Sequence, residues 1–409
     1  MSPRRLDRNV IALGVASLLN DVSSEMIFPL LPAFLTSVLG ASPTFLGAIE
    51  GTADSVSSLL RIPSGWLADR HRRKPLVVAG YAVANLVRPA VAAATAPWHV
   101  LAIRLLDRVG KGVRTAPRDA LLADSAPPED RGRAFGFHRS MDHIGAVVGP
   151  LLASVLFAAV GRSYRWLFLL ASLPGLATVL FTLTLVREPR TALGDRSSAV
   201  GEEPAAPVAV GRKPAAASRR FYGLLLAILC FGLGNSTDAF LLLRLEQGGV
   251  DVVLLPFLWS ALHVVKVASA YPLGRLSDRV GRVPIIVAGW SYYAIIYAGF
   301  AAASSPLWLS VVFVAYGLFY GFTEGAERAL VSDLAPAERR GEAFGLYNAA
   351  VGIVALPASL AMGAIWQAYG QPAAFGFGAA MAVLGAVVLV AAYWPAPQSK
   401  QATCRVKSR

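Results

Sequence analysis

Two carboxylates stand four residues apart inside the first long apolar segment of this chain, residues 9–38. At that spacing, Asp21 and Glu25 share one face of a helix. Each carboxylate raises the proton affinity of the other, and removal from water raises it further. We therefore predict that both bind and release protons or contact a substrate; the alternative is a structural ion pair with nearby basic residues. Pro29 and Pro32 follow and predict a kink just beyond the acids.

Basic side chains recur every three or four residues along another apolar segment, residues 98–121, and so share one broad side of a helix. The stripe consists of Arg104, Arg108, Lys111, Thr115 and Arg118, with Asp107 and Arg114 beside it. Charges at membrane depth normally face a partner or a watery cavity, so the stripe predicts a cavity wall. Arg108 is expected to tune the proton affinity of the two acids, whereas Lys111 and Arg114 are expected to face the substrate.

Further charged and aromatic residues inside apolar segments complete the predicted cavity. Asp142 shares a helix face with His138 and Arg139, and we predict that it serves as a counter-ion and takes part in proton coupling. His138 and Arg139 themselves are assigned to the substrate cavity. The other predicted cavity residues are Asp54, Arg61, Arg88, Asp238, Lys266, Tyr316, Tyr320 and Glu324. Glu50 lies near the outer end of its segment and is expected to be solvated.

Long apolar helices must position these residues. Of the 409 residues, 55% are hydrophobic and only 15% are charged, against about 25% charged in soluble proteins. Runs near 20 residues are long enough to cross a bilayer of about 30 Å as helices, and their continuity argues against a β-barrel. We predict an all-α membrane protein with twelve spans near 9–38, 43–67, 75–95, 98–121, 133–160, 165–186, 221–245, 251–275, 283–303, 307–330, 341–366 and 373–394.

The chain also repeats itself. An offset of 209 residues takes Asp69-Arg70 to Asp278-Arg279, and an offset of 213 takes Glu25 to Asp238. Two homologous six-helix bundles are predicted, and proteins built in this way usually rock one half against the other around a central site. The predicted parts are an N-terminal bundle (1–187), a cytoplasmic linker (188–219), a C-terminal bundle (220–396) and a cytoplasmic tail (397–409).

Charge predicts the orientation. The net charge is +13, and Arg and Lys gather in loops that fall on one side if the spans alternate. The positive-inside rule then places both termini in the cytoplasm, and the basic surface suits anionic lipid headgroups rather than nucleic acid. The first segment holds two acids and no small-residue cleavage site, so we do not interpret it as a signal peptide. The two cysteines, Cys230 and Cys404, support neither a disulfide framework nor a thiolate metal site, and no cofactor is expected.

At the loop after the second span, the chain resembles the major facilitator superfamily. The family pattern G-x-L-x-D-R-x-x-R-[RK] is matched from Gly65 to Lys74, and its copy is matched from Gly274 to Arg282. A fourth-span pattern, R-x-x-x-G, is matched by Arg108 and Gly112. The antiporter-type fifth-span pattern, G-x-x-x-G-P, is matched from Gly145 to Pro150, although Leu151-Leu152-Ala153 follow where the family usually carries more glycine.

This resemblance implies a gate at the cytoplasmic ends of the helices. Gly65 lets two helices approach closely, and Asp69 accepts hydrogen bonds from the positive N-terminus of a helix that starts here near Gly341. Arg73 is expected to pair with Asp124. The predicted gate residues are Gly65, Asp69, Arg70, Arg73 and Asp124, with Asp278, Arg279, Arg282 and Asp333 in the second half. We expect these links to be closed when the halves meet and broken when they part.

The prediction is a secondary active transporter of a small solute, working by alternating access and most simply by proton-coupled efflux of an organic compound. The alternative is an organic-anion or phosphate-ester carrier, because the first half is rich in Arg and Lys. A non-transporting membrane sensor is a distant third. No nucleotide-binding loop or nucleophile constellation is found, so an enzyme is not expected. The expected partners are protons, lipid and the solute, for a monomer in the bacterial plasma membrane.

Overall fold

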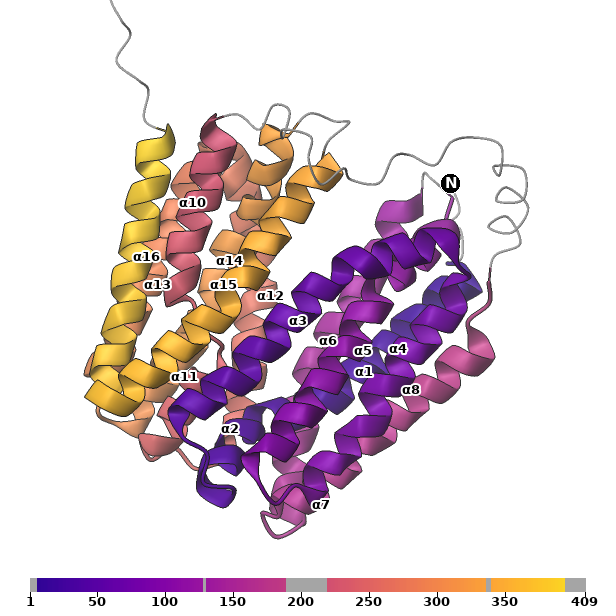
Figure 1. Cartoon of the computed structure of the whole chain (residues 1–409), viewed down its shortest axis with the longest axis horizontal. Helices are drawn as coiled ribbons and strands as arrows, with labels where there is room; N and C mark the ends of the chain where they lie inside the picture. Colours follow the sequence, from indigo (N-terminus) through magenta and orange to yellow (C-terminus); the bar gives the residue numbers. More distant parts are fainter. Residues whose placement is uncertain (1–5, 128–129, 189–218, 336–339, 394–409) are drawn as a thin grey trace, which may run out of the picture.

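The structure is a computed structural model, and it describes residues 6–127, 130–188, 219–335 and 340–393. These residues form helices and short connections that fall into two groups, residues up to 188 (the N half) and residues from 219 (the C half) (Figure 1). Arg8, Arg219 and Tyr393 mark one end of the helices, which we call the terminus side; the opposite end is the far side. In Figure 1 the two groups converge toward the far side. The predicted linker (188–219) and tail (397–409) lie almost entirely outside the described residues.

The N half contains eleven helical elements along its described residues. They are α1 (Arg8–Ile27), η1 (Phe28–Leu30), α2 (Leu31–Ala33), η2 (Phe34–Val38), α3 (Pro43–Arg70), α4 (Arg73–Val87), η3 (Arg88–Ala93), α5 (Pro97–Asp124), α6 (Arg131–Ala159), α7 (Tyr164–Leu170) and α8 (Ser172–Leu185). The C half contains α10 (Arg219–Gly234), α11 (Ala239–Gln247), α12 (Leu254–Val280), α13 (Arg282–Ala302), α14 (Pro306–Leu334), α15 (Arg340–Tyr369) and α16 (Gln371–Tyr393).

The first span of each half is interrupted at membrane depth. In the N half, Pro29 and Pro32 cannot supply backbone N–H donors, and the α-helix gives way to the 3₁₀ turn η1 and then to the π-helical turn η2. The regular α-helix is therefore interrupted where the kink is predicted. In the C half, α10 ends at Gly234 and α11 begins at Ala239, so residues 235–238 form the break. Glu25 and its repeat-mate Asp238 therefore stand beside equivalent interruptions.

Ten helical segments within the described residues are long and apolar enough to cross a membrane, not the predicted twelve. The exceptions are α3 and α5, which are 28 residues each. Both are long enough to cross, but α5 carries the basic stripe and α3 carries Glu50, Asp54 and Arg61. Their charge keeps them below the hydropathy that the other spans reach.

The halves meet through α3 against α15 and through α6 against α12. The backbones of α3 and α15 approach so closely that a Cβ atom on Gly47 would overlap the carbonyl of Ser359, and one on Gly363 would lie 2.6 Å from the carbonyl of Pro43. At the far side, Thr44 donates to Gln367 over 2.7 Å, and Arg162 pairs with Asp251 over 3.1 Å. The far side is therefore closed by contacts between the halves.

The same helices separate toward the terminus side. The contact of α3 with α15 is traced as far as Ser58 and Gly352. Nearer the terminus side, Gly136 of α6, Gly274 of α12 and Gly345 of α15 have no other part of the described chain within 4 Å of the position of a Cβ atom. The divergence of the ribbons in Figure 1 agrees with these open positions. The structure shows the halves joined at the far side and parted at the terminus side.

Candidate functional site

A cavity of about 500 Å³ lies between the halves, lined by α1, α3 and α5 on one wall and by α10, α12, α14 and α15 on the other. We call these the N wall and the C wall. The charged residues that line it are Glu25, Glu50, Asp54, Arg108, Lys111, Asp238, Glu324, Glu327 and Arg328. Seven of the lining residues are among the predicted site residues: Glu25, Arg108, Asp54, Lys111, Asp238, Tyr320 and Glu324.

Two ion pairs form the base of the N wall. Glu50 binds Arg104 through both carboxylate oxygens, and Glu50 is only 1% exposed. The expectation that Glu50 is solvated is therefore wrong, because the basic stripe of α5 packs against this part of α3. Behind it, Asp107 accepts from Arg88 over 2.8 Å and lies 4.0 Å from Arg104. These buried charges neutralise one another, as buried ions require.

Three further N-wall groups lack such a close partner. Arg108 lies 4.0 Å from Asp107, and its Nε atom is buried without a hydrogen-bond acceptor. Lys111 and Asp54 both line the cavity, and neither forms an ion pair or hydrogen bond with another described side chain. The predicted cavity residue Arg61 lies on α3, but its side chain is outside the described part of the structure. The N wall therefore presents charges that are free to interact with a bound compound.

Glu25 connects the two walls. Its carboxylate accepts a hydrogen bond from the indole Nε1 of Trp259, on α12 of the C half, over 2.8 Å. The Trp259 ring also packs against Phe28, with ring centroids 5.1 Å apart. Trp259 was not predicted, because one tryptophan in an apolar segment gives no signal of its orientation. The contact places a carboxylate of the first span directly at the junction of the halves.

The carboxylates of the C wall are held by neutral donors. Asp238 accepts from Tyr316 over 3.1 Å and from Tyr320 over 2.5 Å. Tyr320 lines the cavity, whereas Tyr316 is fully buried behind it. In the same way, Glu327 accepts from Trp290 over 3.1 Å and from Tyr347 over 2.9 Å. Phenol and indole donors stabilise these carboxylates without cancelling their charge.

Glu324 differs from its neighbours because it has a cationic partner. Lys266 donates to it over 2.7 Å and lies 4.1 Å from the centroid of the Tyr320 ring. Lys266 itself does not line the cavity, which corrects its predicted position.

Several other predicted cavity residues are buried inside the N half instead. Arg88 is used in its pair with Asp107, and Arg114 stacks over the Tyr81 ring at 4.5 Å with two guanidinium nitrogens unpartnered. His138 is buried and Arg139 is exposed, and neither lines the cavity. These positions are corrections: the broad face of α5 that carries the basic stripe contacts both the cavity and the neighbouring helix α4.

Asp21 and Asp142 also lie behind the N wall, not on it. Asp142 accepts from Ser17 of α1 over 2.5 Å and lies 3.5 Å from His138, so it joins α6 to α1. Asp21 accepts from Asn20 over 2.9 Å. Glu25 is thus the predicted coupling acid that the structure places in the cavity.

The predicted gate pairs are formed, but each lies within one half. Arg73 of α4 binds Asp124 of α5 and the carbonyl of Ala120, the latter over 3.1 Å. Arg282 of α13 lies 2.5 Å from Asp278 and 3.4 Å from Asp333. Both sets are intact although the halves are parted on this side. The expectation that these pairs break when the halves part is therefore wrong.

The remaining gate residues surround these pairs. Gly65 of α3 faces Ala116 of α5, whose Cβ lies 3.8 Å from the position of a Cβ on the glycine. Arg70 stacks on Trp66 at 3.8 Å, and Arg279 is exposed. The side chain of Asp69 lies outside the described part of the structure. A Cβ at Gly65 would make an ordinary van der Waals contact, so the predicted close approach is not found there, and the two helices belong to the same half.

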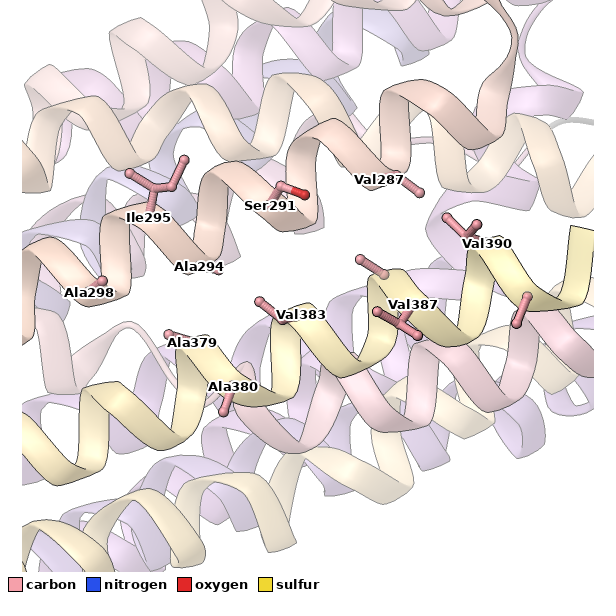
Figure 2. Close-up of a pocket in the computed structure, with 12 residues that line it drawn as sticks. Val287, Ser291, Ala294, Ile295, Ala298, Ala379, Ala380, Val383, Val387 and Val390 are labelled. Atoms are coloured by element: carbon pink, nitrogen blue, oxygen red, sulfur yellow. The ribbon is translucent and has the colours of Figure 1, made fainter. Parts of the chain in front are cut away.

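A second, larger hollow of about 1060 Å³ lies between α13 and α16, away from the charged groups (Figure 2). Val287, Ala294 and Ile295 line it from α13 and Val383 and Val387 from α16, and Ser291 is its one polar lining residue among those described. An apolar groove on a membrane helix pair suits lipid chains. It offers no group that could orient a polar compound, so the central cavity is the candidate site.

Two homologous halves of long apolar helices, with interrupted spans and a charged cavity between them, define the class of helical membrane transporters. The sequence profile of the Major Facilitator Superfamily matches residues 13–356 and 249–407. The chain belongs to this family.

Relatives support the assignment. An uncharacterised MFS-type transporter of Methanocaldococcus jannaschii is 32% identical over 394 residues, which cover 95% of each chain. A homologue of the multi-drug resistance efflux pump PmrA from Lactococcus lactis is 26% identical over 340 residues, 81% of each chain.

Solved structures share the fold. The nucleoside transporter NupG matches 94% of this chain and 99% of its own with a TM-score of 0.77 at 15% identity. A bacterial homologue of the lysosomal transporter Spinster, inward-facing and occupied, matches 94% of each chain with a TM-score of 0.71 at 16% identity.

Proposed function

We propose that this protein exports a small organic compound in exchange for protons. The observation that carries the proposal is the position of Glu25, a carboxylate at membrane depth that lies in the central cavity and accepts a hydrogen bond from the other half. An ionisable residue in a membrane span is a functional site by default. The PmrA relatives, named as multi-drug efflux pumps, support the direction of transport.

The positive-inside rule assigns the terminus side to the cytoplasm. Basic residues gather there, at Arg8, Arg70 to Lys74, Arg131, Arg219 and Arg282, whereas the far side has Arg162 and Arg165. With α3 and α5 included as spans, the chain crosses the bilayer twelve times, as a monomer of the bacterial plasma membrane. The cavity then opens to the cytoplasm, where it collects the compound before the halves rock.

Proton exchange follows from competition in one cavity. Ionised Glu25 is the better acceptor for the Trp259 N–H, because hydrogen bonds to charged groups are stronger. A proton that arrives from outside neutralises Glu25, weakens this link and removes a negative charge from the cavity. A compound with a cationic group then leaves, and deprotonation toward the cytoplasm restores the starting state.

The organic-anion carrier remains the second candidate, and the cavity positions of Arg108 and Lys111 favour it. The two candidates differ in the sign of coupling. Protonation of Glu25 makes the cavity more positive, so it strengthens binding of an anion and weakens binding of a cation. An anion would therefore travel with protons, whereas a compound with a cationic group would travel against them.

The test uses proteoliposomes with purified protein and a panel of cationic, neutral and anionic organic dyes. With an imposed pH gradient, the wild type should concentrate at least one dye and move protons in the opposite direction. A pH indicator inside the liposomes detects the proton movement. Glu25→Gln should abolish uphill transport and leave dye exchange without a gradient intact, and Asp130→Asn, which lies outside the cavity, should behave as wild type. Uphill transport by Glu25→Gln at the normal rate would overturn the proposal.

A further inference from the structure

The two cavity walls carry charged groups that have no close charged partner among the described residues. On the N wall, Lys111 forms no ion pair with a described residue, and Arg108 has only Asp107, 4.0 Å from a buried Nε that finds no hydrogen-bond acceptor in the described part of the chain. On the C wall, Asp238 and Glu327 accept only from phenol and indole groups. A charge removed from water is unfavourable unless an opposite charge compensates it. Each wall therefore holds groups to which a bound compound can supply a close counter-ion.

We propose that the transported compound is a zwitterion with an aromatic or other apolar body. Its anionic group binds Arg108 and Lys111, and its cationic group binds Asp238 and Glu327. The inference rests on the proposed function, because it names the substrate class of the same cavity. A zwitterion carries no net charge, so its entry does not add to the charge of the cavity.

The other charged residues of the cavity indicate which groups contact the substrate. Glu50 is neutralised by Arg104 and Glu324 by Lys266, so neither needs a charge from the substrate. Two carboxylates also lie on the N wall, Asp54 without a close partner and Glu25 with the neutral Trp259 donor, and both offset part of the positive charge there. Arg328 lines the cavity from the C wall but is exposed, so water solvates it. The pairs that remain are Arg108 with Lys111, and Asp238 with Glu327.

A compound with a single charge can pair with the unpartnered groups of only one wall. A cation would neutralise Asp238 and Glu327 but would face Arg108 and Lys111 across the same 500 Å³ cavity. An anion would do the reverse. Repulsion from the opposite wall then reduces affinity in both cases, which is how charged sites reject wrong ligands.

The body of the compound is indicated by the aromatic lining. Phe28 and Trp259 stand near the junction of the halves, and Phe231, Phe319 and Tyr320 belong to the C wall. The Phe231 and Phe319 ring centroids are 5.8 Å apart, and those of Phe319 and Tyr320 are 5.2 Å apart. Such rings pack on apolar groups and attract cations over their faces. The volume is within the range of pockets that hold drug-sized ligands.

The test uses three matched probes: an aminomethyl-biphenyl carboxylic acid, which is a zwitterion, its methyl ester, a cation, and its N-acetyl derivative, an anion. Binding to the purified protein in nanodiscs is measured by calorimetry at neutral pH. The zwitterion should bind roughly tenfold or more tightly than either derivative, since each derivative loses a charge-assisted contact. Equal or tighter binding of the cation or of the anion would overturn the inference.

Variants assign the two contacts. Lys111→Gln should lower the preference for zwitterion over cation, and Asp238→Asn should lower the preference for zwitterion over anion. Lys111→Arg keeps the charge and should keep the preference, which separates lost charge from lost folding. Arg220→Gln, at the terminus-side end of α10, should change neither ratio.

Proton coupling is measured separately in liposomes with the same probes. If a pH gradient drives exchange and the cation is transported best, the zwitterion inference is contradicted and the proposed proton antiport is supported. If the zwitterion binds tightly but a pH gradient does not move it, the antiport is contradicted and the zwitterion inference is supported.

Discussion

The indole N–H of Trp259 donates to the carboxylate of Glu25 over 2.8 Å, and this hydrogen bond joins the C half to the N half. Trp259 is 5% exposed, so this hydrogen bond is shielded from bulk water. A hydrogen bond is stronger in such a low-dielectric interior than it is in water. The proton-binding state of Glu25 is therefore linked to a contact that must change when the halves move. This link relates proton binding to alternating access in the proposed mechanism.

Trp259→Phe retains most of the ring and removes the N–H donor. Because that donor joins Glu25 to the C half, its loss should weaken the contact between the halves and raise the rate of dye exchange. We expect a change of roughly tenfold, from a charge-assisted hydrogen bond of about 1.5 kcal/mol. The measurement is the initial rate of dye exchange in liposomes. An unchanged or lower rate would mean that the bond does not hold the halves together.

The pH dependence of binding gives the sign of coupling. In the exchange mechanism, proton and compound compete, so the apparent affinity should rise with pH. The limiting slope is about tenfold per pH unit for one competing proton. Calorimetric titrations at a series of pH values measure it, with Glu25→Gln as a pH-insensitive reference. Affinity that falls as pH rises would favour the anion carrier.

Gly47 is required where α3 crosses α15. A methyl group there overlaps the backbone carbonyl of Ser359, and only a shift of the backbone can relieve that overlap. Gly47→Ala should therefore destabilise the protein by about 1–3 kcal/mol. Gly376 of α16 has no described atom near the position of its Cβ, and Gly376→Ala serves as the control. Thermal unfolding in detergent compares the two. Equal unfolding temperatures for both variants would show that this crossing does not hold the halves together.

The charge pairs on the terminus side should act within their own halves. A double-mutant cycle of Arg73→Gln with Asp124→Asn should give a coupling free energy of about 1 kcal/mol, typical of a partly exposed pair. The pair of Arg282 with Asp333 is more exposed, at 25% and 59% for the two side chains, and should give less. Unfolding free energies measure both cycles. The reverse order, or no coupling at Arg73, would contradict this assignment.

Asp69 provides the test of gating. We expect Asp69→Asn to weaken closure of the terminus side, whereas Asp278→Asn, which removes a pair within the C half, should leave closure unchanged. A cysteine at Ala120 should then react faster with a membrane-impermeant thiol reagent added from the cytoplasmic side. Cys230 and Cys404 are both replaced beforehand so that the reagent reports one site. Unchanged or slower labelling in Asp69→Asn would argue against a gating role.

Much of the architecture was determined by local sequence. Continuous apolar runs predict membrane helices whatever their neighbours, and Pro29 and Pro32 dictate a break because they lack the N–H donors of a regular helix. The internal repeat paired Glu25 with Asp238, and both line the cavity. Helix period also placed the basic stripe on one side of α5. These features depend on spacing along the chain, and the printed sequence contains them in full.

The assignment of each charge to cavity or interior was decided by tertiary structure. Lys111 and Arg114 are three residues apart on one helix face, yet Lys111 lines the cavity and Arg114 stacks on Tyr81. The difference arises because α4 meets α5 where Gly80 and Gly110 allow close approach, which covers Arg114 and leaves Lys111 open. Periodicity specifies which residues share a face. Only the packing of neighbouring helices decides which part of that face remains accessible to a substrate, because the contacts involved join residues far apart in sequence.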